Sequence, residues 1–389
     1  MPGPNSFTGE DVAEFQFHGS TLIAQRILRS LYTLDIRAAE PGEFSKRAFL
    51  NGKLDLLQAE AIADLISATS DRALSVATEQ LQGRLSRSVS AVAEPLRQAL
   101  TEIEASLDFA EEEIEPEAPP RLLPLLQQTD AALSELIQSY AYGHIIRDGF
   151  RVLIAGRPNA GKSSLLNALL QKPRAIVTPV PGTTRDLIEE SLTLQGYRLV
   201  LCDSAGITET TDQVEAVGVS LAKERLAWAD LVLYVVDANA AAQSEEQLLA
   251  LIAGKNSQVW LVLNKIDLVS QTRIAALLDS TLSRRQFAIS AVLGSGLTVL
   301  KSALIEELER RRLEAAQLNA LITNERHRSC FVKAQESAAR AAAAISAKLP
   351  AEIVAAEMSL ALSALEEIVG KTTPEEILNR IFSKFCIGK

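Results

Sequence analysis

The sequence contains a phosphate-binding pattern at residues 156–164, GRPNAGKSS, which includes GxxxxGKS from Gly156 to Ser163. Glycines at both ends let the backbone wrap closely around an anion, so that N–H groups and the start of the next helix point at phosphate oxygens. Lys162 would reach the β- and γ-phosphates, and the Ser163 hydroxyl would bind Mg²⁺. The same letters also arise by chance in turns, so the flanking elements decide between the two readings.

Those flanking elements have the required order. Residues 151–155 are mostly branched and apolar, as in a buried strand, and residues 162–170 place their apolar residues on one helical face. A strand before the loop and a helix after it favour a nucleotide-binding loop over a chance match. Within this loop the predicted nucleotide-binding residues are Asn159, Ala160, Gly161, Lys162, Ser163 and Ser164.

Two stretches near predicted strand ends suit the γ-phosphate side of a nucleotide. PGTTRD at 181–186 offers Thr184 as a second hydroxyl for Mg²⁺, and DSAG at 203–206 offers the Asp203 carboxylate for the metal's water shell. Together they would sense whether the γ-phosphate is present. The predicted binding residues here are Thr178, Pro179, Val180, Pro181, Gly182, Thr183, Thr184, Asp203, Ser204, Ala205 and Gly206.

Two later stretches select the base. The Asp267 carboxylate of NKID can accept hydrogen bonds from guanine N1–H and the exocyclic amine, a donor pair that adenine lacks. In SAV, the Ala291 N–H is expected to reach guanine O6. Five motifs in this order therefore predict a GTPase. The residues assigned to base recognition are Asn264, Lys265, Ile266, Asp267, Ser290, Ala291 and Val292.

The sequence has no glutamine at the position that orients the attacking water in Ras-like GTPases. Ras-like GTPases place one directly after the DxxG glycine, where this chain has the apolar Ile207. Arg157 and Arg185 are near the motifs, but neither has the positional signature of an arginine finger. The sequence therefore does not show, by comparison with Ras-like GTPases, which residue helps to cleave the γ-phosphate.

Composition bounds the class of protein. The 389 residues, 47% hydrophobic and 23% charged, suit a globular protein of two or three domains. A net charge of -10 argues against tight non-specific nucleic-acid binding but leaves room for a specific RNA contact. Three scattered cysteines do not form a disulfide or zinc framework. With neither a signal peptide nor a spanning apolar run, the chain is expected to be cytoplasmic, without a membrane partner.

The hydrophobic pattern changes twice along the chain. It predicts helices at 21–34, at 54–109 with breaks at Gly83 and Pro95, at 122–142, and from 300 to 385 with breaks at Pro350 and near Gly370; the acidic run 111–120 is taken as a solvated loop. Between them, alternating strands and helices predict a doubly wound, mostly parallel sheet. The predicted strands are 151–155, 187–194, 198–203, 231–237, 258–264 and 286–289, with a hairpin turn at Gln195-Gly196.

On GRPNAGKSS, IVTPVPGTTRD, DSAGI, NKID and the terminal FCIGK, the chain resembles the MnmE (TrmE) family of tRNA-modification GTPases. The resemblance covers essentially the whole chain, including TGEDVAEF and PGEFSKRAFLNGKLDLLQAEAIADLI. It implies a P-loop GTPase domain inserted in an all-α helical domain, after a partial α+β folate-binding domain. The implied domains are 1–51 (folate binding and dimerisation), 52–147 (helical, first part), 148–313 (G domain) and 314–389 (helical, second part).

The resemblance also implies an activity. With the flavoprotein MnmG (GidA), which carries FAD, family members place an aminomethyl or carboxymethylaminomethyl group on C5 of the wobble uridine of certain tRNAs. A tetrahydrofolate, as the 5,10-methylene or 5-formyl derivative, supplies the one-carbon unit, and GTP hydrolysis with Mg²⁺ drives the cycle. The implied assembly is a homodimer that forms a heterotetramer with MnmG.

Further residues are assigned by this resemblance. A K⁺ ion at Asn159, Thr178, Val180 and Thr183 would supply the charge of an arginine finger. Glu215 would polarise the attacking water, and Cys386 of FCIGK would be required for modification, with nearby lysines favouring its thiolate. By residue type alone, Asn159 is a turn former, Glu215 a solvated charge and Cys386 an inert packing residue. Cys202 and Cys330 are interpreted as structural.

The folate pocket of the family matches Glu14, Lys53 and Lys389. Family members begin some tens of residues earlier, with strands and an arginine that help to hold the folate, and this chain lacks that usual N-terminal start. Folate affinity and the N-terminal dimer are therefore expected to be weakened, either through a truncated gene model or through loss of that function.

Two alternatives stay open. One is an assembly switch like the Era or Der GTPases, which bind ribosomal RNA without chemistry on it; those append a basic module, whereas this chain has an acidic helical domain. The other is a GTPase that hydrolyses GTP but no longer modifies tRNA.

Overall fold

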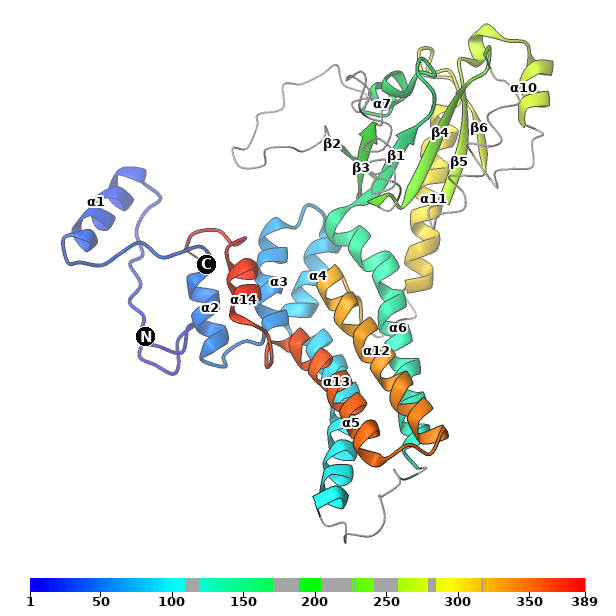
Figure 1. Ribbon diagram of the computed structural model, residues 1–389. Coiled ribbons are helices and arrows are strands. Elements are labelled where there is room, and N and C mark those ends of the chain that lie inside the picture. Colours follow the sequence, from blue (N-terminus) through cyan, green and yellow to red (C-terminus); the bar gives the residue numbers. More distant parts are fainter. Residues whose placement is uncertain are drawn as a thin grey trace, which may run out of the picture. The chain divides into compact units, whose positions relative to one another are not determined.

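The computed structural model describes residues 1–108, 119, 121–170, 189–203, 226, 228–240, 258–278, 285–315, 318 and 320–388. The chain divides into two compact units, each treated by itself (Figure 1). The helical unit combines Met1–His144 with Gln317–Lys389, and the sheet unit is Ile145–Ala316. The helical unit is therefore built from two stretches of chain that are far apart in sequence.

The sheet unit contains a six-stranded sheet in the order β2-β3-β1-β4-β5-β6 (Figure 1). All neighbouring strands are parallel except β2 and β3, which form an antiparallel hairpin. The predicted turn of this hairpin is confirmed, with φ of 47° at Gln195 and 81° at Gly196. The strands are β1 (Phe150–Ala155), β2 (Glu189–Leu194), β3 (Tyr197–Asp203), β4 (Leu231–Asp237), β5 (Gln258–Asn264) and β6 (Gln286–Ala288).

Strand β4 shows why this sheet could be predicted. Its first six residues are all buried, as expected for a parallel strand covered on both faces. On α11, Leu300, Leu304 and Leu308 recur every four residues and are fully buried, which gives that helix one apolar face. The helices of the sheet unit are α7 (Lys162–Leu170), the 3₁₀ turn η2 (Ile266–Leu268), α10 (Gln271–Leu278) and α11 (Leu297–Ala315).

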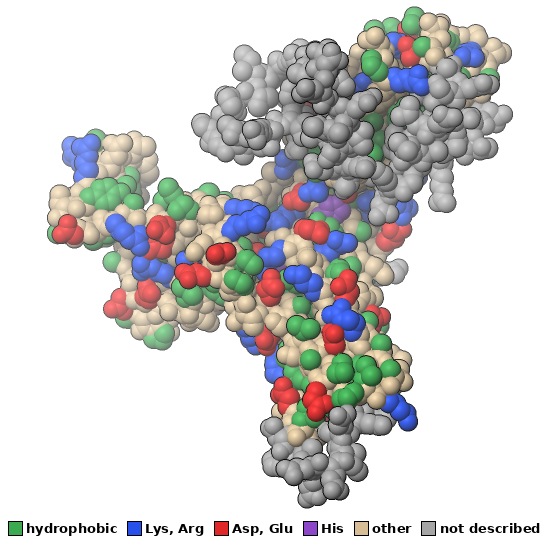
Figure 2. All heavy atoms as spheres, in the orientation of Figure 1, with side chains coloured by type: hydrophobic (Ala, Val, Ile, Leu, Met, Phe, Trp, Pro, Cys, Tyr) green, Lys and Arg blue, Asp and Glu red, His purple; other side chains and the backbone are tan. Residues whose placement is uncertain are grey.

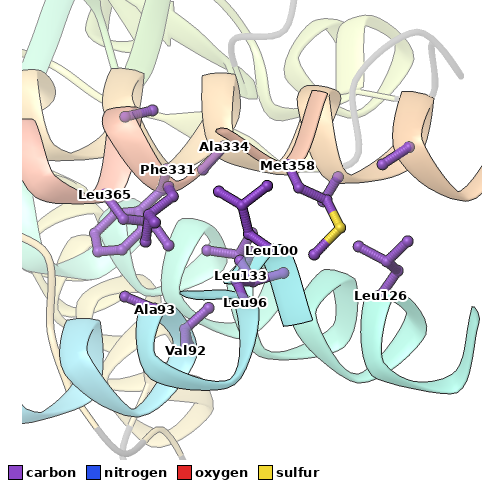
Figure 3. Close-up of a cluster of buried hydrophobic side chains, with 14 of the residues drawn as sticks. Val92, Ala93, Leu96, Leu100, Leu126, Leu133, Phe331, Ala334, Met358 and Leu365 are labelled. Carbon is purple, nitrogen blue, oxygen red and sulfur yellow. The ribbon is translucent and has the colours of Figure 1, made fainter. Parts of the chain in front are cut away.

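Helices from both stretches of chain share one apolar core in the helical unit. Figure 3 shows Leu96 of α5 and Leu133 of α6 close to Phe331 of α12 and Met358 of α13. None of these four side chains is exposed to solvent. The helices are α1 (Thr21–Tyr32), α2 (Glu43–Leu50), α3 (Leu56–Ser67), α4 (Asp71–Leu81), α5 (Arg84–Asp108), α6 (Leu122–Asp148, shared with the sheet unit), α12 (Glu325–Ser346), α13 (Ala351–Val369) and α14 (Glu375–Phe382).

Four helix predictions need correction. The predicted helix 54–109 has a further break, because α3 ends at Ser67 and α4 begins at Asp71 with Ser70 as its N-cap. Pro95 does not break the helix, because α5 runs through it; Val92 and Leu96 on either side are buried, and their packing offsets a proline penalty of about 3 kcal/mol. Helix α6 continues to Asp148 rather than ending at 142. The C-terminal helical region has a further break at 321–324, where the Asn324 side chain accepts from Arg326 N and caps α12.

Residues 1–51 show little core of their own. Helix α1 has no buried residue, although one of its faces is apolar. The β structure recorded in this stretch is one isolated bridge, between Pro41 and Ile387. That bridge places the C-terminal FCIGK stretch beside the start of α2.

A charged cluster is buried inside the helical unit. The Glu60 carboxylate on α3 accepts hydrogen bonds from Arg326 Nη2 at 2.9 Å and contacts His327 Nε2 at 2.6 Å. Burial alone would raise the pKa of Glu60, but the charges and hydrogen bonds of His327 and Arg326 lower it to about 2. Since Arg326 also donates to the carbonyls of Glu367 and Ile368, the cluster joins α3, α12 and α13.

Acidic and basic side chains are interspersed over the described face of the helical unit in Figure 2. In the described part of the chain, no helix is both long and apolar enough to cross a membrane.

Candidate functional site

The predicted phosphate-binding loop joins β1 to α7, as its sequence requires. Gly156 has φ of +148°, and a Cβ there would lie 2.2 Å from the Val235 carbonyl oxygen on β4. Gly161 has φ of +93°, and its Cβ would lie 2.2 Å from Asn264 Nδ2. Both positions therefore require glycine, and the loop is held closely against two other segments.

Asn264 joins three motifs through one side chain. It ends β5 and is 2% exposed, and its Nδ2 donates to Ala160 O in the loop at 3.0 Å. Its Oδ1 accepts from Ala291 N at 3.0 Å. In this structure the Ala291 N–H that was assigned to guanine O6 is thus bound to Asn264. The amide fixes the phosphate loop and the SAV loop relative to each other.

The next residue, Lys265, makes a parallel connection. Its Nζ donates to Asn159 O and to Asp237 Oδ2, each at 2.7 Å. Burial alone would raise the pKa of Asp237, but the hydrogen bonds from Lys265 and from backbone N–H groups lower it below its ordinary value. Asp237 is a residue that the motif analysis missed, since it belongs to none of the quoted motifs.

The side chains of Ser163 and Asp203, both assigned to the Mg²⁺ side of the nucleotide, are in direct contact. Ser163 Oγ donates to Asp203 Oδ2 at 2.8 Å, although the two residues are 40 positions apart. A hydroxyl and a carboxylate at this separation form a set of hard oxygen donors, which is what Mg²⁺ prefers. Lys162 lies close by, is 8% exposed, and donates from Nζ to Arg157 O at 3.0 Å.

The base-recognition residues lie on two adjoining turns. Asp267 is exposed in η2, and Ile266 N donates to Ile289 O just before the SAV stretch. Ser290 is buried, and its Oγ accepts from Leu293 N at 3.2 Å. Val292 is 81% exposed, so it contributes little to this packing.

Many assigned residues lie outside the described part of the chain, and nothing structural is stated for them. They are Thr178, Pro179, Val180, Pro181, Gly182, Thr183, Thr184, Arg185, Ser204, Ala205, Gly206, Ile207, Glu215 and Lys389.

The residues assigned to modification chemistry belong to the helical unit. Cys386 is exposed, and its carbonyl accepts from Gly42 N at 3.4 Å, while the preceding Phe385 is buried with Phe382 against α3. Cys202 and Cys330 are buried, in agreement with a structural role, and burial raises the pKa of Cys330 to about 11.

Lys53 lines a cavity of about 780 Å³ in the helical unit, with Arg97 and Glu366 among its other lining residues. Its Nζ donates to Pro4 O at 3.0 Å. Glu14, the other described residue of the folate match, is exposed and is not among the lining residues. The structure therefore does not bring these two residues together around the cavity. Among the described residues, no group of three or more His, Cys, Asp or Glu side chains could hold a metal ion.

A mostly parallel sheet with a glycine-bounded loop before α7, a paired Ser163 and Asp203, and NKID at the end of β5 defines a P-loop GTPase. The family model "MnmE helical domain" matches residues 56–386, and "GTP-binding protein TrmE N-terminus" matches residues 1–53. The chain belongs to the MnmE family of tRNA modification GTPases.

Two relatives named tRNA modification GTPase MnmE agree with this assignment. The tRNA modification GTPase MnmE of Geobacter metallireducens is 42% identical over 389 residues, covering 100% of this chain and 84% of that protein. The protein of the same name from Moorella thermoacetica is 42% identical over 394 residues, with the same coverage. Among solved structures, Era of Aquifex aeolicus is 26% identical over 48% of this chain and 66% of that chain, with a TM-score of 0.34.

Proposed function

We propose that this GTPase acts with an FAD-dependent MnmG (GidA) partner to modify C5 of the wobble uridine in certain tRNAs. The product is carboxymethylaminomethyl or aminomethyl uridine, and a 5,10-methylene or 5-formyl tetrahydrofolate supplies the one-carbon unit. The observation that carries this proposal is the 42% identity to a tRNA modification GTPase over the whole chain, not over the G domain alone. The proposed setting is the cytoplasm, with a homodimer that joins MnmG in a heterotetramer.

The proposed GTP site uses the chain's own groups in three ways. Asn264 and Lys265 hold two successive carbonyls of the phosphate loop, which keeps the loop in shape for the triphosphate. Lys162 would move from the Arg157 carbonyl to the β- and γ-phosphates. Asp267 would accept from guanine and disfavour adenine, because adenine offers no matching donor pair and would leave the carboxylate unpaired in the complex.

Two metal ions are part of the proposal. Ser163 and Thr184 would hold Mg²⁺, with Asp203 binding its water shell; the contact between Ser163 and Asp203 supports this donor set. Asn159, Thr178, Val180 and Thr183 would hold K⁺, and the exposed Asn159 on the loop supports that position. When bound, the K⁺ ion supplies positive charge beside the phosphates in place of an arginine finger. Glu215 would orient the attacking water.

In the helical unit, Cys386 is the proposed residue for modification chemistry. Its exposed thiol, beside the buried Phe385, is accessible to a substrate at a fixed point of the fold. Glu14, Lys53 and Lys389 are proposed to contact the folate. The division into residues 1–51, 52–147, 148–313 and 314–389 is the proposed domain assignment for these roles.

Complementation of a cell that lacks wobble-uridine modification tests the proposal. The wild-type chain should restore the modified uridine, whereas Cys386→Ser should hydrolyse GTP normally and restore none. The control is Ser383→Ala, an exposed neighbour that should behave as wild type. Restoration by Cys386→Ser would remove the thiol from the mechanism. A wild-type chain that hydrolyses GTP but restores no modification would support the alternative, a GTPase switch without modification chemistry.

The metal assignments are tested by hydrolysis rates. Exchange of Na⁺ for K⁺ should raise the rate steeply, and equal rates in both salts would refute the site at Asn159. Glu215→Ala should retain nucleotide affinity and lose most turnover, and an unchanged rate would return this residue to a solvated charge.

A further inference from the structure

We propose that Asp237 is a positioning residue for guanine-nucleotide binding, acting through Lys265 on the Asn159 carbonyl of the phosphate loop. Asp237 lies at the end of β4, the strand that pairs with both β1 and β5. The inference rests on the GTP site proposed above and adds to it a residue that lies outside the sequence motifs.

The two carboxylate oxygens of Asp237 have different partners. Oδ1 accepts from Asn239 N at 2.9 Å and so closes the turn that follows β4. Oδ2 accepts from Lys265 Nζ at 2.7 Å. One oxygen therefore serves the local backbone and the other serves the neighbouring loop, and a substitution can separate the two roles.

Lys265 carries the effect to the phosphate loop. Its ammonium group donates to Asn159 O, and Asn159 has a left-handed φ of 63°. Residues other than glycine seldom adopt this conformation, so it persists only where the surroundings hold it. A fixed donor on the Asn159 carbonyl does so, because the peptide group cannot rotate without losing that bond.

The neighbouring carbonyl is held in the same way. Ala160 O accepts from Asn264 Nδ2, so two successive carbonyls of the loop bind two successive side chains at the end of β5. In a trans peptide the N–H points away from the carbonyl, and the N–H of Gly161 is therefore directed away from Asn264. This orientation leaves it available to an anion.

The charge of Asp237 is what fixes Lys265. The side chains of Lys265 and Asp237 are 30% and 20% exposed, so their attraction is partly shielded from water. Without the carboxylate, the flexible ammonium group would have the Asn159 carbonyl as its one acceptor among the contacts described. The carboxylate also balances a positive charge beside the proposed K⁺ ligand Asn159.

Asp237→Asn is the informative variant. It retains an oxygen that can accept from Asn239 N and loses the acceptor for Lys265. Dissociation constants are measured with a fluorescent GDP analogue and Mg²⁺, and affinity should fall roughly five- to tenfold, the size of one ordinary net hydrogen bond. Glu314→Gln removes a carboxylate from an exposed pair with Arg310 in the same unit and should leave the affinity unchanged.

The same substitution in a Lys265→Met variant tests whether Asp237 acts through Lys265 or only supports the fold. In Lys265→Met protein, Asp237→Asn should cause no further loss, because the residue through which it acts is gone. A loss of the same size in that background would mean that Asp237 acts through its turn, and would overturn the inference. Equal affinities of Asp237→Asn and Glu314→Gln would also overturn it. A wild-type chain that binds no guanine nucleotide would instead refute the proposed GTP site itself.

Discussion

The two units bury polar side chains in different ways. In the helical unit, Glu60, Arg326 and His327 form a charged cluster between helices, and Glu60 is only 7% exposed. In the sheet unit, Asn264 and Lys265 lie at the end of a strand and bind the carbonyls of a loop. The first set joins helices to one another, whereas the second sets the shape of a loop that a ligand must enter.

The buried charged cluster stabilises the fold of the helical unit, whereas Asn264 and Lys265 stabilise the conformation of the phosphate loop. Removal of one partner from a buried ion pair leaves an uncompensated charge, so the free energy of unfolding should fall. Removal of a loop contact at the sheet edge leaves the apolar core intact, so ligand affinity should fall instead. Substitutions in the two sets should therefore separate stability from nucleotide binding, and three predictions test this separation.

Arg326→Met should have the largest effect. It leaves the Glu60 carboxylate without its guanidinium partner, and the free energy of unfolding should fall by about 3–5 kcal/mol. Urea unfolding followed by circular dichroism measures this change. Arg328→Met removes an exposed pair with Glu325 on the same helix and should cost at most about 1 kcal/mol. If both variants unfold at the same urea concentration, the buried cluster has no special role in stability.

The same cluster should make stability depend on pH. The pKa of Glu60 is lowered to about 2 in the folded chain, against an ordinary value of 4.5. Its stabilisation is therefore complete above about pH 4.5 and is lost as the pH falls toward 2, by up to about 3 kcal/mol. The difference in unfolding free energy between wild type and Arg326→Met should shrink over this range. A difference that stays constant from pH 6 to pH 3 would contradict the assignment.

Gly161→Ala should affect the other region. The added Cβ would lie 2.2 Å from Asn264 Nδ2, and Asn264 cannot move without losing its bonds to Ala160 and Ala291. Affinity for GDP should fall about a hundredfold, equivalent to about 2–3 kcal/mol, with the helical unit unaffected. Gly196→Ala has a similar positive φ but meets nothing within 4 Å, and should bind normally. Equal affinities of the two variants would contradict this prediction, because the close contact at Gly161 would then not matter for binding.

The sheet unit could be predicted well because its signals are local. Strand β4 is a run of apolar residues, and the loop from Gly156 to Ser163 is a fixed pattern with a strand and a helix beside it. The motifs of Ser163 and Asp203 were expected near strand ends, although the direct hydrogen bond between the two side chains was not predicted.

What escaped prediction depends on contacts between distant positions. Glu60 and Arg326 are 266 positions apart, and no local pattern in the sequence pairs them. Asp237 is the last residue of an apolar strand, and its proposed role depends on Lys265, which is 28 positions later. Pro95 was misjudged for a related reason, because the packing that keeps α5 intact comes partly from α12 and α13.

The split of the helical unit has a consequence for synthesis on the ribosome. Leu133 and Phe331 share one core, but the sheet unit is translated between them. At a translation rate of about 5–20 residues per second, roughly 10–40 seconds pass between the synthesis of α5 and α6 and that of α12 and α13. During that interval their apolar faces have no C-terminal partner, while the contiguous sheet unit can already fold. The nascent chain should therefore bind chaperones through its first helices until the last quarter of the protein is made.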